Sequence, residues 1–116
     1  MKENPATINS TSIVRNPYER LVALYLDSWE KIGFSQWLEK RNIQPQADLI
    51  DPQNLVLHLE NLQAEIEAIN LDPSGYTNIP APTEHWQRWY DDALLEQVDP
   101  IVKKDLLTFG YYRFKK

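Results

Sequence analysis

An arginine stands immediately before the expected start of a helix, where it could help to bind an anion. Arg15 ends a short β-type run, Asn16 is a favourable N-cap residue, and Pro17 suits the first helical position. Glu19 follows three residues after the cap, which is the spacing of a capping box. Free N–H groups at a helix start and a nearby cation together suit phosphate, so residues 15–19 form a candidate phosphate site.

The same stretch resembles a known nucleotide-binding motif. Arg-Asn-Pro-Tyr-Glu-Arg-Leu-Val-x-x-Tyr, residues 15–25, is similar to the 3′-phosphate-binding motif of sulfotransferases, especially the carbohydrate-sulfotransferase-like branch. The resemblance implies that the cofactor is 3′-phosphoadenosine-5′-phosphosulfate (PAPS), with Arg15 as phosphate ligand and Arg20 supporting the site. It also implies weakened binding of PAPS or 3′,5′-diphosphoadenosine, because the family's serine ligand is replaced here by Ala23.

Three further segments resemble the family, in the family's order. They are Gln-Pro-Gln-Ala-Asp at 44–48, Leu-Glu-Asn-Leu at 59–62, and Lys-Asp-Leu-Leu-Thr-Phe-Gly-Tyr at 104–111. The resemblance therefore implies an α/β fold: the helix-rich C-terminal part of a P-loop-like sulfotransferase fold with a small parallel sheet. Residues 1–116 are expected to form a single partial domain, with 1–10 as a loose tail.

The catalytic half of such an enzyme is not found in this sequence. Sulfuryl transfer needs backbone N–H groups and a cation around the phosphosulfate, and a general base for the acceptor hydroxyl. The three glycines, Gly33, Gly75 and Gly110, form no phosphate loop. We therefore predict no catalytic residue, and a chain that is inactive alone. The expected partner is an upstream sulfotransferase half, or a second copy of the chain.

Other polar and aromatic candidates have simpler explanations. Arg15 could instead pair with an acidic helix end, and Arg20 with Glu60. His58 is expected to be a packed core residue and His85 a surface residue. Trp86, Trp89 and Tyr90 could stack on a sugar, but their helical spacing is more typical of a core. No His, Asp or Glu set has metal-ligand spacing, so no metal site is predicted.

Hydrophobic periodicity predicts alternating strands and helices. Strands are expected at 11–14 and 55–59, and helices at 17–32, 35–41, 62–70 and 92–109. Gly33 is expected to end the first helix, Ser35 to cap the second, Asn61 the third and Thr83 a short turn. Pro100 should restart or kink the last helix, and Gly110 should end it. Two strand-to-helix units favour a parallel sheet, packed by the first and last helices.

Composition excludes several classes of function. The net charge is −5 and the pI is near 4.9, so broad attraction to nucleic acid or anionic membranes is not expected. No apolar run is long enough to span a bilayer, the N-terminus lacks a signal peptide's apolar region, and cysteine is absent. A cytoplasmic location is expected. The alternative to an enzyme fragment is a non-enzymatic helical protein-interaction module.

Overall fold

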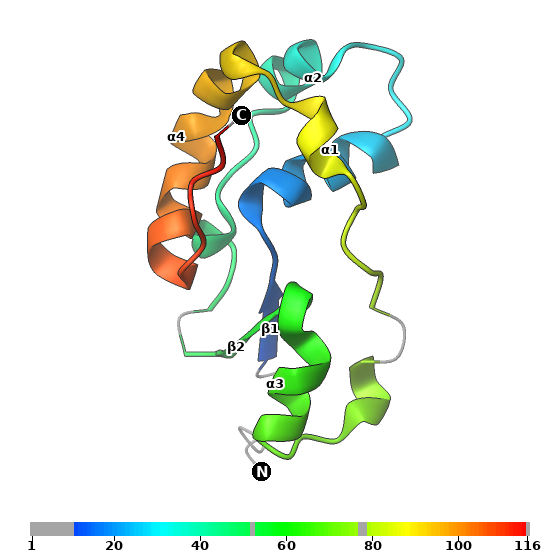
Figure 1. Ribbon diagram of the computed structural model, residues 1–116, viewed down its shortest axis with the longest axis vertical. Helices are drawn as coiled ribbons and strands as arrows, with labels where there is room; N and C mark the ends of the chain where they lie inside the picture. The colour runs from blue at the N-terminus through cyan, green and yellow to red at the C-terminus, as the bar shows by residue number, and fades with distance from the viewer. Residues whose placement is uncertain (1–10, 52, 77–78, 116) are drawn as a thin grey trace. The chain divides into compact units, whose positions relative to one another are not determined.

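The chain combines helices with a small parallel sheet, as the sequence predicts for an α/β protein. The computed structural model describes residues 11–51, 53–76 and 79–115 (Figure 1). The chain divides into two compact units, Met1–Arg15 with Ile50–Pro82 and Asn16–Leu49 with Thr83–Lys116. Each unit is described by itself. The predicted N-terminal tail, residues 1–10, lies outside the described residues.

The first unit contains the sheet. Strand β1, Thr11–Val14, pairs in parallel with strand β2, Leu55–His58, in a register that joins Thr11 to Leu55 and Val14 to His58 (Figure 1). The parallel pairing predicted from the two strand-to-helix units is therefore confirmed. β2 ends one residue early, because Leu59 begins the 3₁₀ turn η3, Leu59–Asn61. Val14, Leu57 and Leu59 are buried.

A short helix follows the second strand of this unit. Helix α3, Leu62–Ala68, has Asn61 at its N-cap position, as expected, but the Asn61 side chain makes no capping bond. Glu65 instead joins the helix to the strand, accepting from His58 N at 2.7 Å and lying 3.0 Å from His58 Nδ1. His58 is thus a half-buried residue with a carboxylate partner, and its prediction as a packed core residue is wrong. The 3₁₀ turn η4, Pro73–Tyr76, completes the unit.

The second unit is helical and holds the main aromatic core. It contains α1, Pro17–Asp27; α2, Phe34–Arg41; the 3₁₀ turns η2, Gln46–Asp48, and η5, Trp86–Trp89; and α4, Asp92–Phe109. α4 has the predicted bounds and continues as one helix through Pro100. It ends before Gly110, whose φ is 78°. The buried cluster consists of Tyr18, Leu21, Val22, Phe34, Trp37, Leu38, Tyr90, Val98 and Val102.

The first helix of this unit is shorter than its periodicity predicts. α1 ends at Asp27 rather than Ile32, because Ser28 Oγ donates to Tyr25 O at 2.6 Å and Trp29 adopts a left-handed φ of 60°. The Tyr25 hydroxyl then donates to Ile32 O at 2.5 Å and fixes the following loop. The predicted roles of Gly33, as the end of the first helix, and of Ser35, as the cap of the second, are also wrong. Gly33 is the N-cap of α2, not a C-terminal stop, while Ser35 lies inside α2 and donates to Gln97.

Trp29 supplies a test of this corrected boundary. A continuous helix would bury its indole, and removing a buried tryptophan costs about 3–5 kcal/mol. In the structure 90 % of Trp29 is exposed, so we expect Trp29→Ala to change the free energy of unfolding by less than about 0.5 kcal/mol. Trp37→Ala is the matched control and should cost several kcal/mol, because Trp37 is 2 % exposed. Urea titration of both variants measures the difference, and equal losses would contradict the boundary.

Candidate phosphate site at the start of helix α1

The predicted cap forms at the start of α1. β1 ends at Val14, Arg15 follows, and Asn16 Oδ1 accepts from Tyr18 N at 2.9 Å and from Glu19 N at 3.4 Å. Pro17 occupies the first helical turn, where its missing N–H leaves no donor unsatisfied. Strand, cap and helix therefore follow one another along the chain as the motif predicts.

This cap also changes which groups are available to an anion. We expected the N–H groups at residues 16–19 to share in binding phosphate. Pro17 has no N–H, and the N–H groups of Tyr18 and Glu19 already donate to the Asn16 side chain. An anion at this turn would compete with Asn16 for those two donors. Of the residues predicted to bind phosphate, Arg15 and Arg20 carry guanidinium groups, which are suited to that task.

Arg20 contacts the loop at residues 44–48, which is one of the further segments that resemble the sulfotransferase family. Its Nη1 donates to the backbone carbonyl of Gln44 at 2.8 Å. The predicted pairing of Arg20 with Glu60 involves the other unit and stays a prediction. A guanidinium carries five N–H donors, so a bond to a carbonyl is compatible with binding an anion as well.

The loop next to Gln44 is bound by a buried carboxylate on α4. Asp105 is fully buried, and its Oδ2 accepts from Gln46 N at 2.9 Å and from Gln46 Nε2 at 3.1 Å. Its Oδ1 accepts from Ala47 N at 2.9 Å. An exposed ion pair between Lys104 and Asp48 lies beside it. Two segments that the sequence treats as separate resemblances, 44–48 and 104–111, are thus in direct contact.

Sequence reasoning included Asp105 in the resemblance at residues 104–111 but gave it no role at the site, although a signal was present. Val98, Val102 and Asp105 follow the i, i+4, i+7 spacing of one helix face, and all three are buried. A carboxylate on an apolar face is rarely buried without partners. That position predicts a set of hydrogen-bond donors opposite Asp105, but which segment supplies them depends on tertiary structure.

Glu19 binds a distant part of the same unit. Its side chain is buried, and Oε2 accepts from Thr83 N at 2.9 Å. Thr83, predicted to cap the following turn, therefore contributes its backbone N–H here, and the N-cap of η5 is His85 with a left-handed φ of 55°. The first turn of α1 is consequently held from within, by Asn16, and from outside, by the 83–90 segment.

Of the three aromatic residues predicted to be core, Tyr90 is buried and Trp86 packs partly buried against the core, but Trp89 is exposed, so the prediction is wrong for Trp89. The Tyr90 hydroxyl donates to Tyr18 O at 2.7 Å, and burial raises the pKa of Tyr90, so the phenol remains a donor. The Trp86 ring stacks on Tyr18 with centroids 6.1 Å apart. His85 is exposed, as expected of a surface residue. The contacts of Tyr90 and Trp86 with Tyr18 position the first turn of α1.

Ala23 lies one helical turn after Arg20. Residues three apart on a helix are neighbours, so the side chains at positions 20 and 23 share one face of α1. Ala23 is half-buried and offers a methyl group where the resembling family has a hydroxyl. A serine here would present its hydroxyl on the same face of α1 as the Arg20 side chain. Within the described ranges, no three His, Asp or Glu side chains gather in a way that could hold a metal ion.

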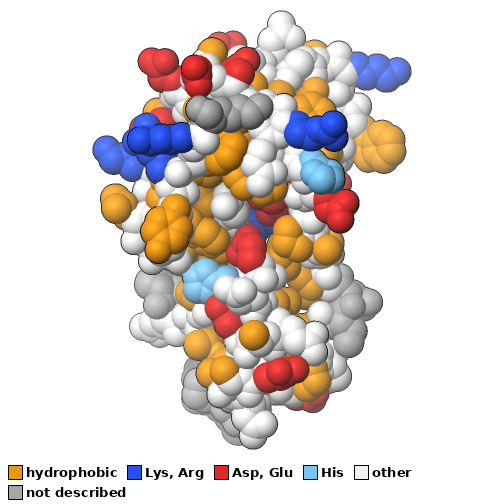
Figure 2. Space-filling model, in the orientation of Figure 1, with side chains coloured by type: hydrophobic (Ala, Val, Ile, Leu, Met, Phe, Trp, Pro, Cys, Tyr) orange, Lys and Arg blue, Asp and Glu red, His pale blue; other side chains and the backbone are white. Residues whose placement is uncertain are grey.

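No known family model, curated protein or solved structure matches this chain. Function must therefore be argued from the chain's own residues. In the described ranges no helix is long and apolar enough to cross a membrane. On the face seen in Figure 2, basic side chains form a few separate groups rather than one continuous surface, as suits a chain with a net charge of −5.

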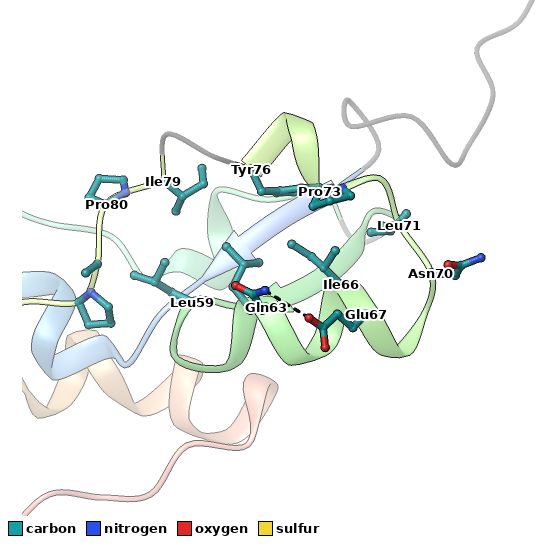
Figure 3. Close-up of a pocket in the computed structure, with 13 residues that line it drawn as sticks. Leu59, Gln63, Ile66, Glu67, Asn70, Leu71, Pro73, Tyr76, Ile79 and Pro80 are labelled. Carbon is teal, nitrogen blue, oxygen red and sulfur yellow. Dashed lines mark hydrogen bonds between the residues drawn. The ribbon is translucent and has the colours of Figure 1, made fainter.

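The first unit also contains a cavity of about 660 Å³ that sequence reasoning did not predict. It lies between α3 and the segment after it, with Leu59 and Ile66 on one side and Tyr76 and Ile79 on the other (Figure 3). Gln63 Nε2 donates to Glu67 Oε2 at 3.2 Å along the same helix. The lining is mostly apolar, and no acid–base pair or arginine is part of it.

Proposed function

We propose that residues 15–20 bind the 3′-phosphate of a 3′-phosphoadenosine nucleotide, in a protein of the sulfotransferase family. The donor in this proposal is PAPS, the acceptor is a hydroxyl of a carbohydrate, and the fold is the C-terminal part of a P-loop-like sulfotransferase fold. The observation that supports it most is the order of the local elements. β1 ends at Val14, Arg15 follows, and α1 starts at Pro17 after the Asn16 cap, which is the strand-to-helix turn predicted from the sequence.

Binding the distal phosphate and transferring the sulfuryl group are separate tasks. The first supplies binding energy, whereas the second needs groups that stabilise the charge that develops on the leaving phosphate. Arg15 and Arg20 are suited to the first task. The sequence has three glycines and no glycine-rich phosphate loop for the second. We therefore propose that a complementary segment outside these 116 residues completes the donor site.

A comparison of two nucleotides tests this proposal. 3′,5′-Diphosphoadenosine and adenosine 5′-monophosphate differ only in the 3′-phosphate, so calorimetric titration should detect weak binding of the first and much weaker binding of the second. Ala23→Ser adds one hydroxyl donor on the helix face that carries Arg20, and one hydrogen bond to a charged group is worth about 1.5–3 kcal/mol. We expect the serine variant to bind the diphosphate about tenfold more tightly.

The same preparation should transfer no sulfuryl group from PAPS to carbohydrate acceptors at an enzyme-like rate. Robust turnover by the chain alone would contradict the proposed division of tasks. Equal affinity for the two nucleotides would contradict the 3′-phosphate site itself.

The second candidate function is a non-enzymatic protein-interaction module. The apolar cavity beside α3 favours it. Trp29 favours it too, because its side chain is almost fully exposed. The loop that carries Trp29 is fixed by the Tyr25 hydroxyl and by the ion pairs of Glu30 with Lys40 and Arg41. Exposed aromatic side chains are common anchors of protein interfaces. The nucleotide titration separates the two functions, because such a module would bind neither nucleotide.

A further inference from the structure

We propose that Asp105 is a positioning residue for the phosphate site, acting on Arg20 through the loop at residues 44–47. The inference rests on the function proposed above, since it assigns Arg20 to the phosphate. Asp105 lies outside the phosphate motif at residues 15–25 and 85 positions after Arg20 in the chain.

The first step is the anchoring of the loop to α4. A carboxylate that is fully buried needs hydrogen-bond donors, and Asp105 has three, namely the backbone N–H groups of Gln46 and Ala47 and the Gln46 side-chain amide. Hydrogen bonds to an ionised acceptor are shorter and stronger than neutral ones. Gln46 is itself buried, so the turn η2 is fixed against α4.

The second step connects the loop to the arginine. Gln44 precedes the anchored residue by two positions, and Pro45 between them, with φ −59°, restricts the backbone. The position of the Gln44 carbonyl therefore follows from that of Gln46. This carbonyl accepts from Arg20 Nη1 at 2.8 Å and so selects one orientation of the guanidinium. All these contacts lie within the second unit.

Ordering of Arg20 before the ligand arrives should increase affinity. An exposed arginine samples many rotamers, and fixing it at the moment of binding lowers the affinity for the ligand. If the loop moves, Arg20 loses its hydrogen bond to the Gln44 carbonyl, and the entropic cost of fixing the side chain has to be met again when the ligand binds. Asp105 would then affect nucleotide binding only while Arg20 is present. A residue that merely stabilises the fold would affect binding equally with and without Arg20.

A double-mutant cycle distinguishes these two roles. The proteins are wild type, Asp105→Asn, Arg20→Ala and the double variant, each titrated with 3′,5′-diphosphoadenosine. In asparagine the NH₂ group replaces one acceptor oxygen, so at least one donor of the loop loses its partner. We expect Asp105→Asn to weaken binding about fivefold in the wild-type background and less than about twofold in the Arg20→Ala background. Equal factors in both backgrounds would overturn the inference.

Asp99→Asn is the matched control. It makes the same change on the same helix, where the carboxylate binds Arg113 at 2.8 Å, and it should leave nucleotide affinity unchanged. If Asp105→Asn does not fold, Gln46→Ala takes its place in the cycle, because it removes only the side-chain donor and keeps both backbone bonds.

An NMR measurement separates failure of the inference from failure of the proposed function. The Arg20 Nε–Hε resonance, assigned by its loss in Arg20→Lys, should have a lower heteronuclear NOE in Asp105→Asn than in wild type. No nucleotide binding by wild type would overturn the proposed function, and the NOE would still decide whether Asp105 orders Arg20. Nucleotide binding with an unchanged Arg20 NOE in Asp105→Asn would overturn the inference alone.

Discussion

Asp105→Ala is expected to lower the free energy of unfolding by about 3–5 kcal/mol, because it leaves two buried and one partly buried N–H donor without the Asp105 acceptor. Each unsatisfied buried donor costs about 1–3 kcal/mol, and partial relaxation of the loop reduces the sum. A domain of ordinary stability has only about 5–15 kcal/mol in total, so the variant should be close to unfolding. Urea titration followed by tryptophan fluorescence measures the change.

The control for this loss is Asp99→Ala. Asp99 also lies on α4, but its ion pair with Arg113 is partly exposed, and exposed ion pairs contribute about 0–1 kcal/mol. A difference of several kcal/mol between the two alanine variants is therefore expected. Similar losses in both would show that the contacts of Asp105 with Gln46 and Ala47 contribute little to the fold.

The regular elements were the most predictable part of the fold, because local patterns determine them. The apolar stripe of α4 and Gly110 after it predicted both ends of the helix, and the β-type patterns at 11–14 and 55–59 predicted the parallel strands. The end of α1 was not predictable in this way. Its apolar spacing continues to Ile32, but the left-handed backbone at Trp29 and the bond from the Tyr25 hydroxyl end it at Asp27.

The candidate site shows the same division between local and long-range information. The Asn16 cap depends on residues within three positions, and the sequence predicted it. The geometry of this cap also explains why Asn16 occupies the N–H groups of Tyr18 and Glu19, which were expected to bind phosphate. The contacts of Arg20 with Gln44 and of Asp105 with Gln46 and Ala47 join segments 24 to 59 positions apart, and no local pattern specifies such pairs.

Arg15→Ala is expected to abolish measurable binding of 3′,5′-diphosphoadenosine. With two N–H groups of the turn already bonded to Asn16, the arginine side chains must supply most of the interaction with the phosphate. A guanidinium can bind phosphate through two parallel hydrogen bonds, and each charge-assisted bond contributes about 1.5–3 kcal/mol. Loss of both would weaken binding more than about a hundredfold. Arg15→Lys keeps the charge but not the paired geometry, so its affinity should lie between the two.

Calorimetric titration of wild type, Arg15→Ala and Arg88→Ala with 3′,5′-diphosphoadenosine tests the 3′-phosphate site most directly. Arg88 is an exposed arginine in η5, so its removal changes the net charge equally while Arg15 is kept. The proposed site predicts weak binding by wild type and Arg88→Ala and no detectable binding by Arg15→Ala. Equal affinity in all three proteins, or loss of binding in both alanine variants, would contradict a phosphate site at Arg15.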